Sequence, residues 1–157
     1  MSRLGFALAA AIAVLDQASK AWIVDLLVEP GRGLNVTSFF NLVYVKNRGI
    51  SFGLFRVDDY WGPWLFGGLG LAIAALLVVW IVRAETRWVA AAVGAVLGGA
   101  IGNILDRIFR GAVVDFLDFH AAGYHWFAFN AADAAISVGV GLLIGISLFG
   151  PAERTKT

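Results

Sequence analysis

Four long apolar runs divide the chain, separated by shorter polar segments. An α-helix rises 1.5 Å per residue, so a run of about 20 residues spans the ~30 Å hydrocarbon core of a bilayer. Tryptophans stand near both ends of the second run, where interfacial aromatic side chains belong. The pattern therefore predicts transmembrane helices over approximately residues 4–28, 61–82, 88–105 and 126–150.

The segment between the first two runs, residues 29–60, has a different pattern. It opens with Pro30, Gly31 and Gly33 and continues with β-branched and aromatic residues in partial alternation up to Asn47. Such a pattern indicates short strands, and the Asn47-Arg48-Gly49 sequence indicates a turn. We expect a small β-rich extramembrane subdomain, which either packs on the helices or holds an extended peptide at a sheet edge.

Composition supports a membrane protein. The chain has 157 residues, of which 60% are hydrophobic and 15% are charged, and its mean hydropathy is +0.80. These values predict a single integral membrane domain over residues 1–157, with four transmembrane helices and a small β-rich subdomain. The net charge of +1 and the absence of a basic run argue against nucleic acid as a partner. Because there is no cysteine, a thiol nucleophile and a cysteine zinc site are excluded.

The first apolar run carries a polar notch. Its uncharged beginning resembles the start of a cleaved signal peptide, but Asp16 and Lys20 interrupt it and apolar residues then resume, which is not a cleavage-site pattern. We therefore favour a continuous helix. Asp16 and Lys20 are four residues apart, so they share a helix face and can neutralise each other in the bilayer. They are either an internal tether between helices or part of a functional site.

Four spans place both termini on the same side of the membrane. A count of lysine and arginine does not decide which side. However, the basic residues on the terminal side lie in very short segments next to helix ends, where the positive-inside rule is strongest. This predicts cytoplasmic termini and outward-facing loops around Asn47 and Asp115.

Acidic residues gather at the predicted outer face. Asp115 is flanked by Val114 and Phe116 without an adjacent cation, and burial of that kind raises the pKa of a carboxyl group. Asp133 opens the last apolar run, roughly 25 Å from the inner end of its helix. Asp106 stands beside Arg107, which we interpret as local charge balance. Asp115 and Asp133 are therefore expected at one membrane face.

Two carboxylates brought together cannot both ionise cheaply, so they share a proton. In an aspartic peptidase, one such acid activates water while the other polarises the scissile carbonyl. The same pattern also fits an ion- or proton-coupled small membrane carrier. His120 and His125, together with Asp118, lack a metal-binding motif such as HExxH. We expect neither a metal nor a cofactor.

Five motifs in order resemble a known family, the bacterial lipoprotein signal peptidases, also called signal peptidase II. The resemblance covers essentially the whole chain. Ser19 replaces the threonine that the family more often has, and a hydroxyl is retained. The motifs are DQASK (16–20), NRGISFG (47–53), GGAIGNILDR (98–107), VVDF (113–116) and FNAAD (129–133).

The resemblance implies a membrane aspartic endopeptidase that removes the signal peptide from diacylglyceryl-modified prolipoproteins, cutting just before the lipidated cysteine. Its partners would be that substrate and membrane lipid, and we expect a monomer in the bacterial cytoplasmic (inner) membrane. The resemblance makes Asp115 and Asp133 the catalytic dyad. The positions that it implies line the site or support it are Asn103, Arg107, Asn130, Asp16, Lys20 and Asn47.

The segment around residues 34–60 is also expected to cover the substrate. Phe52 and Phe55 lie within it, and Trp61 follows directly. A loop with these aromatic side chains would act as a lid over the site.

Overall fold

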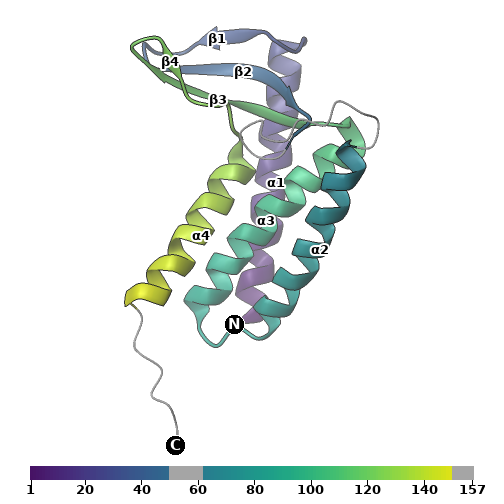
Figure 1. Ribbon diagram of the computed structural model, residues 1–157, viewed down its shortest axis with the longest axis vertical. Coiled ribbons are helices and arrows are strands. Elements are labelled where there is room, and N and C mark those ends of the chain that lie inside the picture. Colours follow the sequence, from purple (N-terminus) through teal and green to yellow (C-terminus); the bar gives the residue numbers. More distant parts are fainter. Residues whose placement is uncertain (50–61, 150–157) are drawn as a thin grey trace, which may run out of the picture.

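Four long helices and a small antiparallel sheet make up the computed structural model, which describes residues 1–49 and 62–149 (Figure 1). Each helix is long and apolar enough to cross a membrane. The predicted fold class, four transmembrane helices with a β-rich subdomain, is therefore confirmed. Of the predicted lid, Phe52, Phe55 and Trp61 lie outside the described residues. The helices are α1 (Ser2–Leu27), α2 (Gly62–Val82), α3 (Arg87–Arg110) and α4 (Ala131–Phe149).

Two helix boundaries differ from the prediction. Helix α3 does not end near residue 105 but continues to Arg110, where Gly111 terminates it in the left-handed conformation with φ of 69°. Helix α4 does not begin near residue 126, because the chain before it is extended and Phe129 pairs with Leu117. The longer α3 places Asp106 and its neighbours inside regular helix, on defined faces.

Helix α3 lies at the centre of the bundle and packs against the other three helices. Glycines allow the helices to approach each other closely. A Cβ atom at Gly98 would lie only 2.6 Å from the carbonyl oxygen of Ala9 in α1, and one at Gly139 in α4 would lie 2.7 Å from the carbonyl oxygen of Ala92. Because lipid supplies no hydrophobic drive for helices to associate, such close packing is what holds the bundle together.

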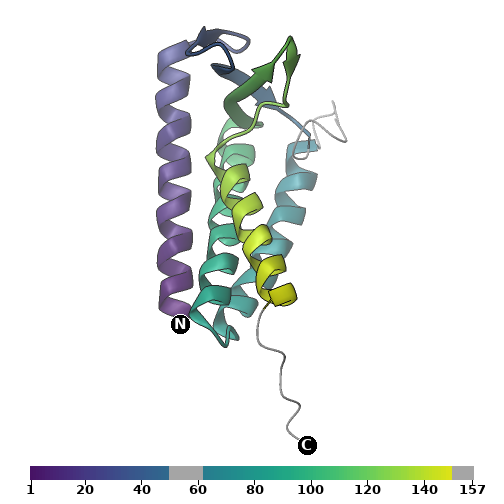
Figure 2. The same cartoon turned by 90° about the vertical axis from the view of Figure 1, so that its left-hand side faces the viewer.

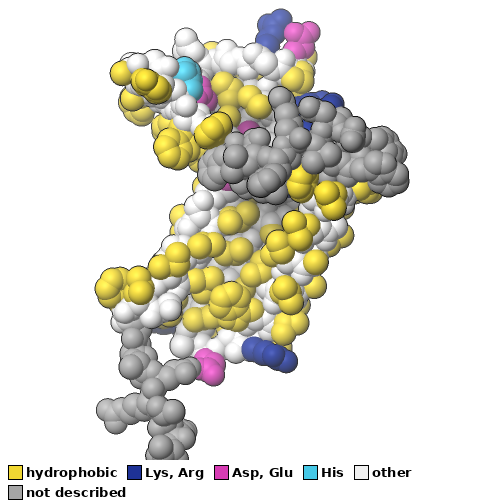
Figure 3. Space-filling view, viewed as in Figure 1, with side chains coloured by type: hydrophobic (Ala, Val, Ile, Leu, Met, Phe, Trp, Pro, Cys, Tyr) yellow, Lys and Arg dark blue, Asp and Glu magenta, His cyan; other side chains and the backbone are white. Residues whose placement is uncertain are grey.

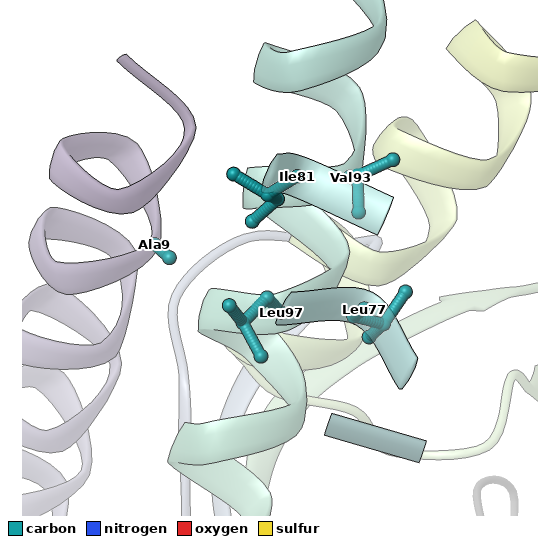
Figure 4. Packing of buried hydrophobic residues seen from close by; sticks show 5 residues of the cluster. All are labelled: Ala9, Leu77, Ile81, Val93 and Leu97. Carbon is teal, nitrogen blue, oxygen red and sulfur yellow. The ribbon is translucent and has the colours of Figure 1, made fainter. Parts of the chain in front are cut away.

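The bundle core toward the beginning of α1 is purely apolar. Figure 4 shows five of its side chains, which come from α1, α2 and α3 and point toward one another. Ile81 and Val93 are fully buried there. The outward faces of the helices are apolar as well, with Leu65, Leu76 and Leu148 exposed. In Figure 3, hydrophobic side chains cover the helices, while charged ones lie toward the two ends, as a bilayer requires.

The sheet caps the end of the bundle opposite to the beginning of α1 and the end of α4 (Figure 1). The strands are adjacent in chain order and antiparallel. The prediction confined the β-structure to residues 29–60, and this is wrong, since half of the strands follow α3. The strands are β1 (Gly33–Asn35), β2 (Phe40–Asn47), β3 (Val113–Ala121) and β4 (Tyr124–His125).

A second apolar cluster seats the sheet on the helices. Ile23 and Leu27, at the end of α1, pack against Tyr44 of β2 and against Val114 and Phe116 of β3. Figure 2 shows the sheet bending over from the end of α1 toward α4. The β2–β3 ladder pairs Val45 with Asp115, so the seating of the sheet fixes the height at which Asp115 meets the bundle.

Candidate active site

Asp115 and Asp133 meet where the sheet joins the bundle. Asp115 lies on β3, and Asp133 lies in the first turn of α4. Asn130, which directly precedes α4, bonds to both residues: its Nδ2 donates to Asp115 Oδ1 at 2.7 Å, and its Oδ1 accepts from the backbone N–H of Asp133 at 3.0 Å. The two aspartates that the sequence singled out are thus linked through one asparagine.

Asp115 is almost entirely buried, with 2% of its surface exposed. Each of its carboxylate oxygens accepts an amide N–H, from Asn130 at Oδ1 and from Asn47 at Oδ2, the latter at 3.0 Å. Burial first, and then the negative charge of Asp133, raise the pKa of Asp115 from its ordinary value of 3.8 to about 7. The two amide hydrogen bonds act in the opposite direction. A carboxyl group in this setting can hold a proton at neutral pH.

Asp133 forms a reciprocal cap at the beginning of α4. The backbone N–H of Asp133 donates to Asn130 Oδ1, while the backbone N–H of Asn130 donates to Asp133 Oδ2 at 3.4 Å. This is the arrangement of a capping box, in which two otherwise unpaired helix donors are satisfied. The other oxygen, Asp133 Oδ1, accepts from Asn103 Nδ2 at 2.9 Å. Asp133 remains partly exposed.

Arg107 connects α3 to the segment after β2. One of its guanidinium nitrogens donates to the backbone oxygen of Gly49 at 2.9 Å, and another donates to that of Asn103 at 3.1 Å. Its charge acts on both Asp115 and Asp133. Arg107 thus brings a positive charge to the dyad and holds the beginning of the predicted covering loop.

A buried ion network joins α1 and α3 at Lys20 and Asp106. Lys20 Nζ is 2.8 Å from Asp16 Oδ2 and 3.0 Å from Asp106 Oδ2, and none of the three side chains is exposed. The neutralisation of Asp16 by Lys20 that the sequence predicted is therefore confirmed. The predicted pairing of Asp106 with Arg107 is not what the structure has, because Asp106 bonds to Lys20 and to Arg110 instead.

The network meets the dyad at two points. Lys20 Nζ also donates to Asn103 Oδ1 at 2.9 Å, and Asp16 Oδ1 accepts from the backbone N–H of Ala132, in the first turn of α4, at 2.9 Å. All the polar positions that the resemblance implied lie in these connected contacts. In the described part of the chain, no buried side-chain nitrogen or oxygen lacks a partner.

Sequence reasoning missed two members of this network. Gln17 Nε2 donates to the backbone oxygen of Gly102 at 3.0 Å, and Gln17 Oε1 accepts from Arg110 at 2.9 Å. The spacing of four between Asp106 and Arg110 is a helical pairing signal. The sequence pattern alone did not reveal this pairing, because it predicts the end of the helix near residue 105, before both residues.

Asp118 and the two histidines lie apart from the dyad, toward the far end of the sheet. Asp118 Oδ2 accepts from Asn41 Nδ2 at 2.9 Å and lies 2.9 Å from His125 Nδ1. The rings of His120 and His125 stack at a centroid distance of 4.8 Å. Within residues 1–49 and 62–149, no group of three or more His, Cys, Asp and Glu side chains is arranged to hold a metal ion.

A cavity of about 230 Å³ opens beside the dyad, between α2, α3 and α4. Its walls are mostly apolar, with Phe66 from α2, Ala100 from α3 and Ile136 from α4. Asn103 and Arg107 also line it. An apolar ligand between these helices would therefore contact the same residues that bond to Asp133 and Gly49.

Two solved structures share this fold. A bacterial membrane enzyme determined by the in meso method at 2.3 Å resolution matches with a TM-score of 0.82 and 26% identity, over 98% of this chain and 92% of that one. A second bacterial membrane enzyme, determined at 1.9 Å, matches with a TM-score of 0.76 and 28% identity, over 92% of each chain. The fold and the buried polar site place the protein in the class of multi-pass bacterial membrane enzymes.

Sequence comparison identifies the family within that class. The family model for signal peptidase (SPase) II matches residues 8–149. The lipoprotein signal peptidase of Beijerinckia indica subsp. indica is 46% identical over 132 residues, 83% of this chain and 79% of the relative. That of Methylobacterium sp. is 46% identical over 143 residues, 90% of this chain and 87% of the relative. The chain belongs to the signal peptidase II family and is a peptidase, as the five motifs predicted.

Proposed function

We propose that this protein is a membrane aspartic endopeptidase that cleaves the signal peptide from diacylglyceryl-modified prolipoproteins, immediately before the lipidated cysteine. Lipoprotein signal peptidase is the name of its relatives. The observation that carries the catalytic assignment is Asn130, which bonds to Asp115 and to Asp133 from one side chain. It holds two carboxyl groups side by side without supplying a charge to either.

The pair performs hydrolysis with water as the nucleophile. One aspartate begins ionised and removes a proton from water, whose oxygen attacks the scissile carbonyl carbon. The other begins protonated and donates to the carbonyl oxygen. The raised pKa of Asp115, about 7, is suited to a group that shares a proton near neutral pH. Arg107 stabilises the negative charge that the pair carries, and Asn47, Asn103 and Asn130 fix its geometry.

Transport is the alternative that the sequence left open. An ion- or proton-coupled carrier needs intramembrane carboxylates that are exposed in turn to the two sides of the membrane. Here Asp115 is buried on a strand of the capping sheet, and Asp16 and Asp106 are paired with Lys20 and Arg110. Together with membership of a peptidase family, these contacts favour hydrolysis.

The apolar cavity offers the substrate a route from the bilayer. An acyl chain of a lipidated cysteine is apolar and stays in the hydrocarbon region, so it enters most easily between helices. The space between α2, α3 and α4 has apolar walls and reaches Asn103 and Arg107. Substrate lodged there would have its scissile bond within reach of the dyad.

The arrangement of the chain supports an orientation. The dyad lies at the sheet end of the bundle, and the beginning of α1 and the end of α4 lie toward the opposite end (Figure 1). With cytoplasmic termini, the site would face the outer side of the bacterial cytoplasmic membrane, where prolipoproteins have been exported. We propose that the whole chain acts there as a single membrane domain and as a monomer.

Cleavage of a defined precursor tests this function. The purified protein should cut a diacylglyceryl-modified prolipoprotein and release a product whose first residue, by mass spectrometry, is the lipidated cysteine. It should leave the unmodified precursor largely uncut. Cleavage at another position, or equal cleavage of both precursors, would contradict the proposal. Proton- or ion-dependent flux in vesicles without cleavage would instead identify a carrier.

A further inference from the structure

Three asparagines face the two aspartates, and each has its amide oxygen already bonded. Asn103 Oδ1 accepts from Lys20 Nζ at 2.9 Å, Asn130 Oδ1 from the Asp133 backbone N–H at 3.0 Å, and Asn47 Oδ1 from the Gly49 backbone N–H at 2.9 Å. An amide carries its acceptor on one branch and its two donors on the other. Because the oxygen is fixed, each amide must turn its N–H groups toward a carboxylate.

The two aspartates are not held in the same way. Asp115 accepts an amide N–H at each oxygen and is buried within a strand. Among the described residues, Asp133 accepts a side-chain N–H only from Asn103, and its Oδ2 has a long contact of 3.4 Å to a backbone N–H. Asp133 is also the more exposed of the two. Its Oδ2 is therefore the carboxylate oxygen best placed to contact a water molecule.

The N-terminal end of α4 acts on the charge of Asp133. Asp133 is in the first turn of α4, where the partial positive charge of a helix N-terminus stabilises an anion. A protonated Asp115, by contrast, keeps lone pairs for its two amide donors and has a hydroxyl hydrogen to give. The difference in environment separates the roles of two chemically identical groups.

Lys20 holds Asn103, which in turn bonds to Asp133. Its ammonium group has three N–H donors, and they go to Asp16, Asp106 and Asn103. Of these three partners, Asn103 is the one that bonds to the dyad. The side chain of Lys20 is fully buried, so it has no water to exchange with. A charged donor makes the stronger hydrogen bond, which holds the Asn103 amide in one orientation.

We propose that Asp133 is the carboxylate that begins the reaction ionised and activates water, and that Lys20 is a positioning residue that keeps it so through Asn103. Water's oxygen then bonds to the carbonyl carbon, its proton passes to Asp133, and the Asp115 proton passes to the carbonyl oxygen. When the C–N bond breaks, Asp133 returns its proton to the leaving nitrogen and a diol hydroxyl returns one to Asp115. This inference rests on the function proposed above.

Two matched variants test the assignment through the pH profile of kcat/KM. Within residues 1–49 and 62–149, the charged groups that face Asp133 are Asp115 from β3, Asp16 and Lys20 from α1, and Arg107 from α3. Asn103→Leu removes the donor to Asp133, so protonation of the base sets in at higher pH. The acidic limb should move upward by about one pH unit, the expected size for one hydrogen bond to a charged group.

Asn47→Leu is the counterpart, because it removes a donor from Asp115. Loss of that donor makes the acid harder to ionise, so the alkaline limb should move upward while the acidic limb changes little. If Asn103→Leu moves the alkaline limb and Asn47→Leu the acidic limb, the two roles are reversed and the assignment is overturned. Macroscopic limbs belong to the pair, so the comparison of the two variants decides.

Lys20→Met tests the relay. In the wild-type background it should move the acidic limb in the same direction as Asn103→Leu, and in the Asn103→Leu background its shift should be smaller. Gln17→Leu disturbs the same ion network without touching Asn103, so it should lower the melting temperature but leave both limbs in place. Equal shifts by Lys20→Met in both backgrounds would exclude a relay through Asn103.

A purely structural role would lower kcat/KM by the same factor at every pH, and that result also contradicts the inference. If Lys20→Met does not fold, the pair Asn103→Leu and Asn47→Leu still decides which aspartate is the base. Failure of the proposed function gives a different result, namely full turnover after replacement of Asp115 or Asp133 by asparagine.

Discussion

Two acidic sites meet helix α3, one at Asp106 and one at Asn103, and the partners of their carboxylates differ. Asp106 is held by ammonium and guanidinium groups, from Lys20 and Arg110. Asp115 and Asp133 are held by the neutral amides of Asn47, Asn103 and Asn130. A cation in direct contact keeps a carboxylate ionised, whereas a neutral amide orients it and leaves it able to exchange a proton. The first site supports the fold, and the second is fit for chemistry.

The largest effect is expected from replacing Lys20, the cation that Asp16 and Asp106 share. Lys20→Met leaves Asp16 without its cation and Asp106 with only Arg110, in a region where neither aspartate is exposed. Removing one partner of a buried pair typically costs about 3–5 kcal/mol. The free energy of unfolding should fall by about that amount, measured by thermal or denaturant unfolding in detergent. A loss below about 1 kcal/mol would mean that the network carries no stability.

At the second site, the pair Asp115 and Asp133, stability should depend on pH. Because the pKa of Asp115 is raised from 3.8 to about 7 by burial and by the charge of Asp133, the folded protein prefers this group protonated. Its contribution to stability is full below pH 3.8 and is lost as the pH rises through about 7. The loss is at most roughly 4 kcal/mol, since one pKa unit corresponds to about 1.4 kcal/mol.

Asp115→Asn should remove this pH dependence. Thermal unfolding between pH 4 and pH 8 should give a smaller fall in melting temperature for the variant than for the wild type, and the variant should be the more stable protein at pH 8. Identical slopes for the two proteins would contradict the raised pKa of Asp115. Asp25→Asn, at an exposed position of α1, is the control and should leave the slope unchanged.

Filling the cavity beside Asp115 and Asp133 should have a smaller effect on catalysis. Ala100→Phe places a ring in the apolar space between α2, α3 and α4. The KM for the lipidated precursor should rise about tenfold, which corresponds to about 1.4 kcal/mol of lost binding, and kcat should change less. Gly141→Phe, at a position of α4 where a Cβ meets open space, should leave both constants unchanged. Equal effects of the two variants would mean that the cavity does not receive substrate.

The smallest effect is expected at the edge of the ion network. Arg110 is 28% exposed, and Asp106 keeps Lys20 and the backbone N–H of Val114 when Arg110 is removed. Arg110→Leu should therefore cost about 1 kcal/mol of stability and leave kcat within about twofold, since a factor of two is only about 0.4 kcal/mol. Turnover assays and unfolding of the same preparation check both. A large loss of kcat would mean that the two sites are not separable.

Sequence patterns could predict the membrane fold because apolar runs of sufficient length have few other uses. They did not predict β3, because Val113–Ala121 is interrupted by Asp115 and Asp118 and follows directly on a helix. The strand forms because it pairs with β2, a contact between residues far apart in the chain. The end of α3 was placed too early because Asp106 and Arg107 read as a polar boundary, whereas Gly111 is the residue that stops the helix.

The sequence could predict which residues form the candidate site, but not which contacts they make. Motif spacing brought Asp115 and Asp133 to one membrane face, and the family resemblance supplied the surrounding asparagines. Which way each amide points depends on Lys20, on the first turn of α4 and on the backbone of Gly49. These partners are fixed by tertiary packing. The choice of Arg110 over Arg107 as a partner of Asp106 likewise follows from the helix face.

The central claim is that Asp115 and Asp133 together activate water, and turnover of single variants tests it most directly. Asp115→Asn, Asp133→Asn and Asp118→Asn are purified, checked for folding, and assayed on one lipidated precursor. The account predicts that the first two lose at least about 10³-fold in kcat, as expected when a member of a catalytic pair is removed, and that Asp118→Asn stays near the wild-type rate. Normal turnover by folded Asp115→Asn or Asp133→Asn would contradict it.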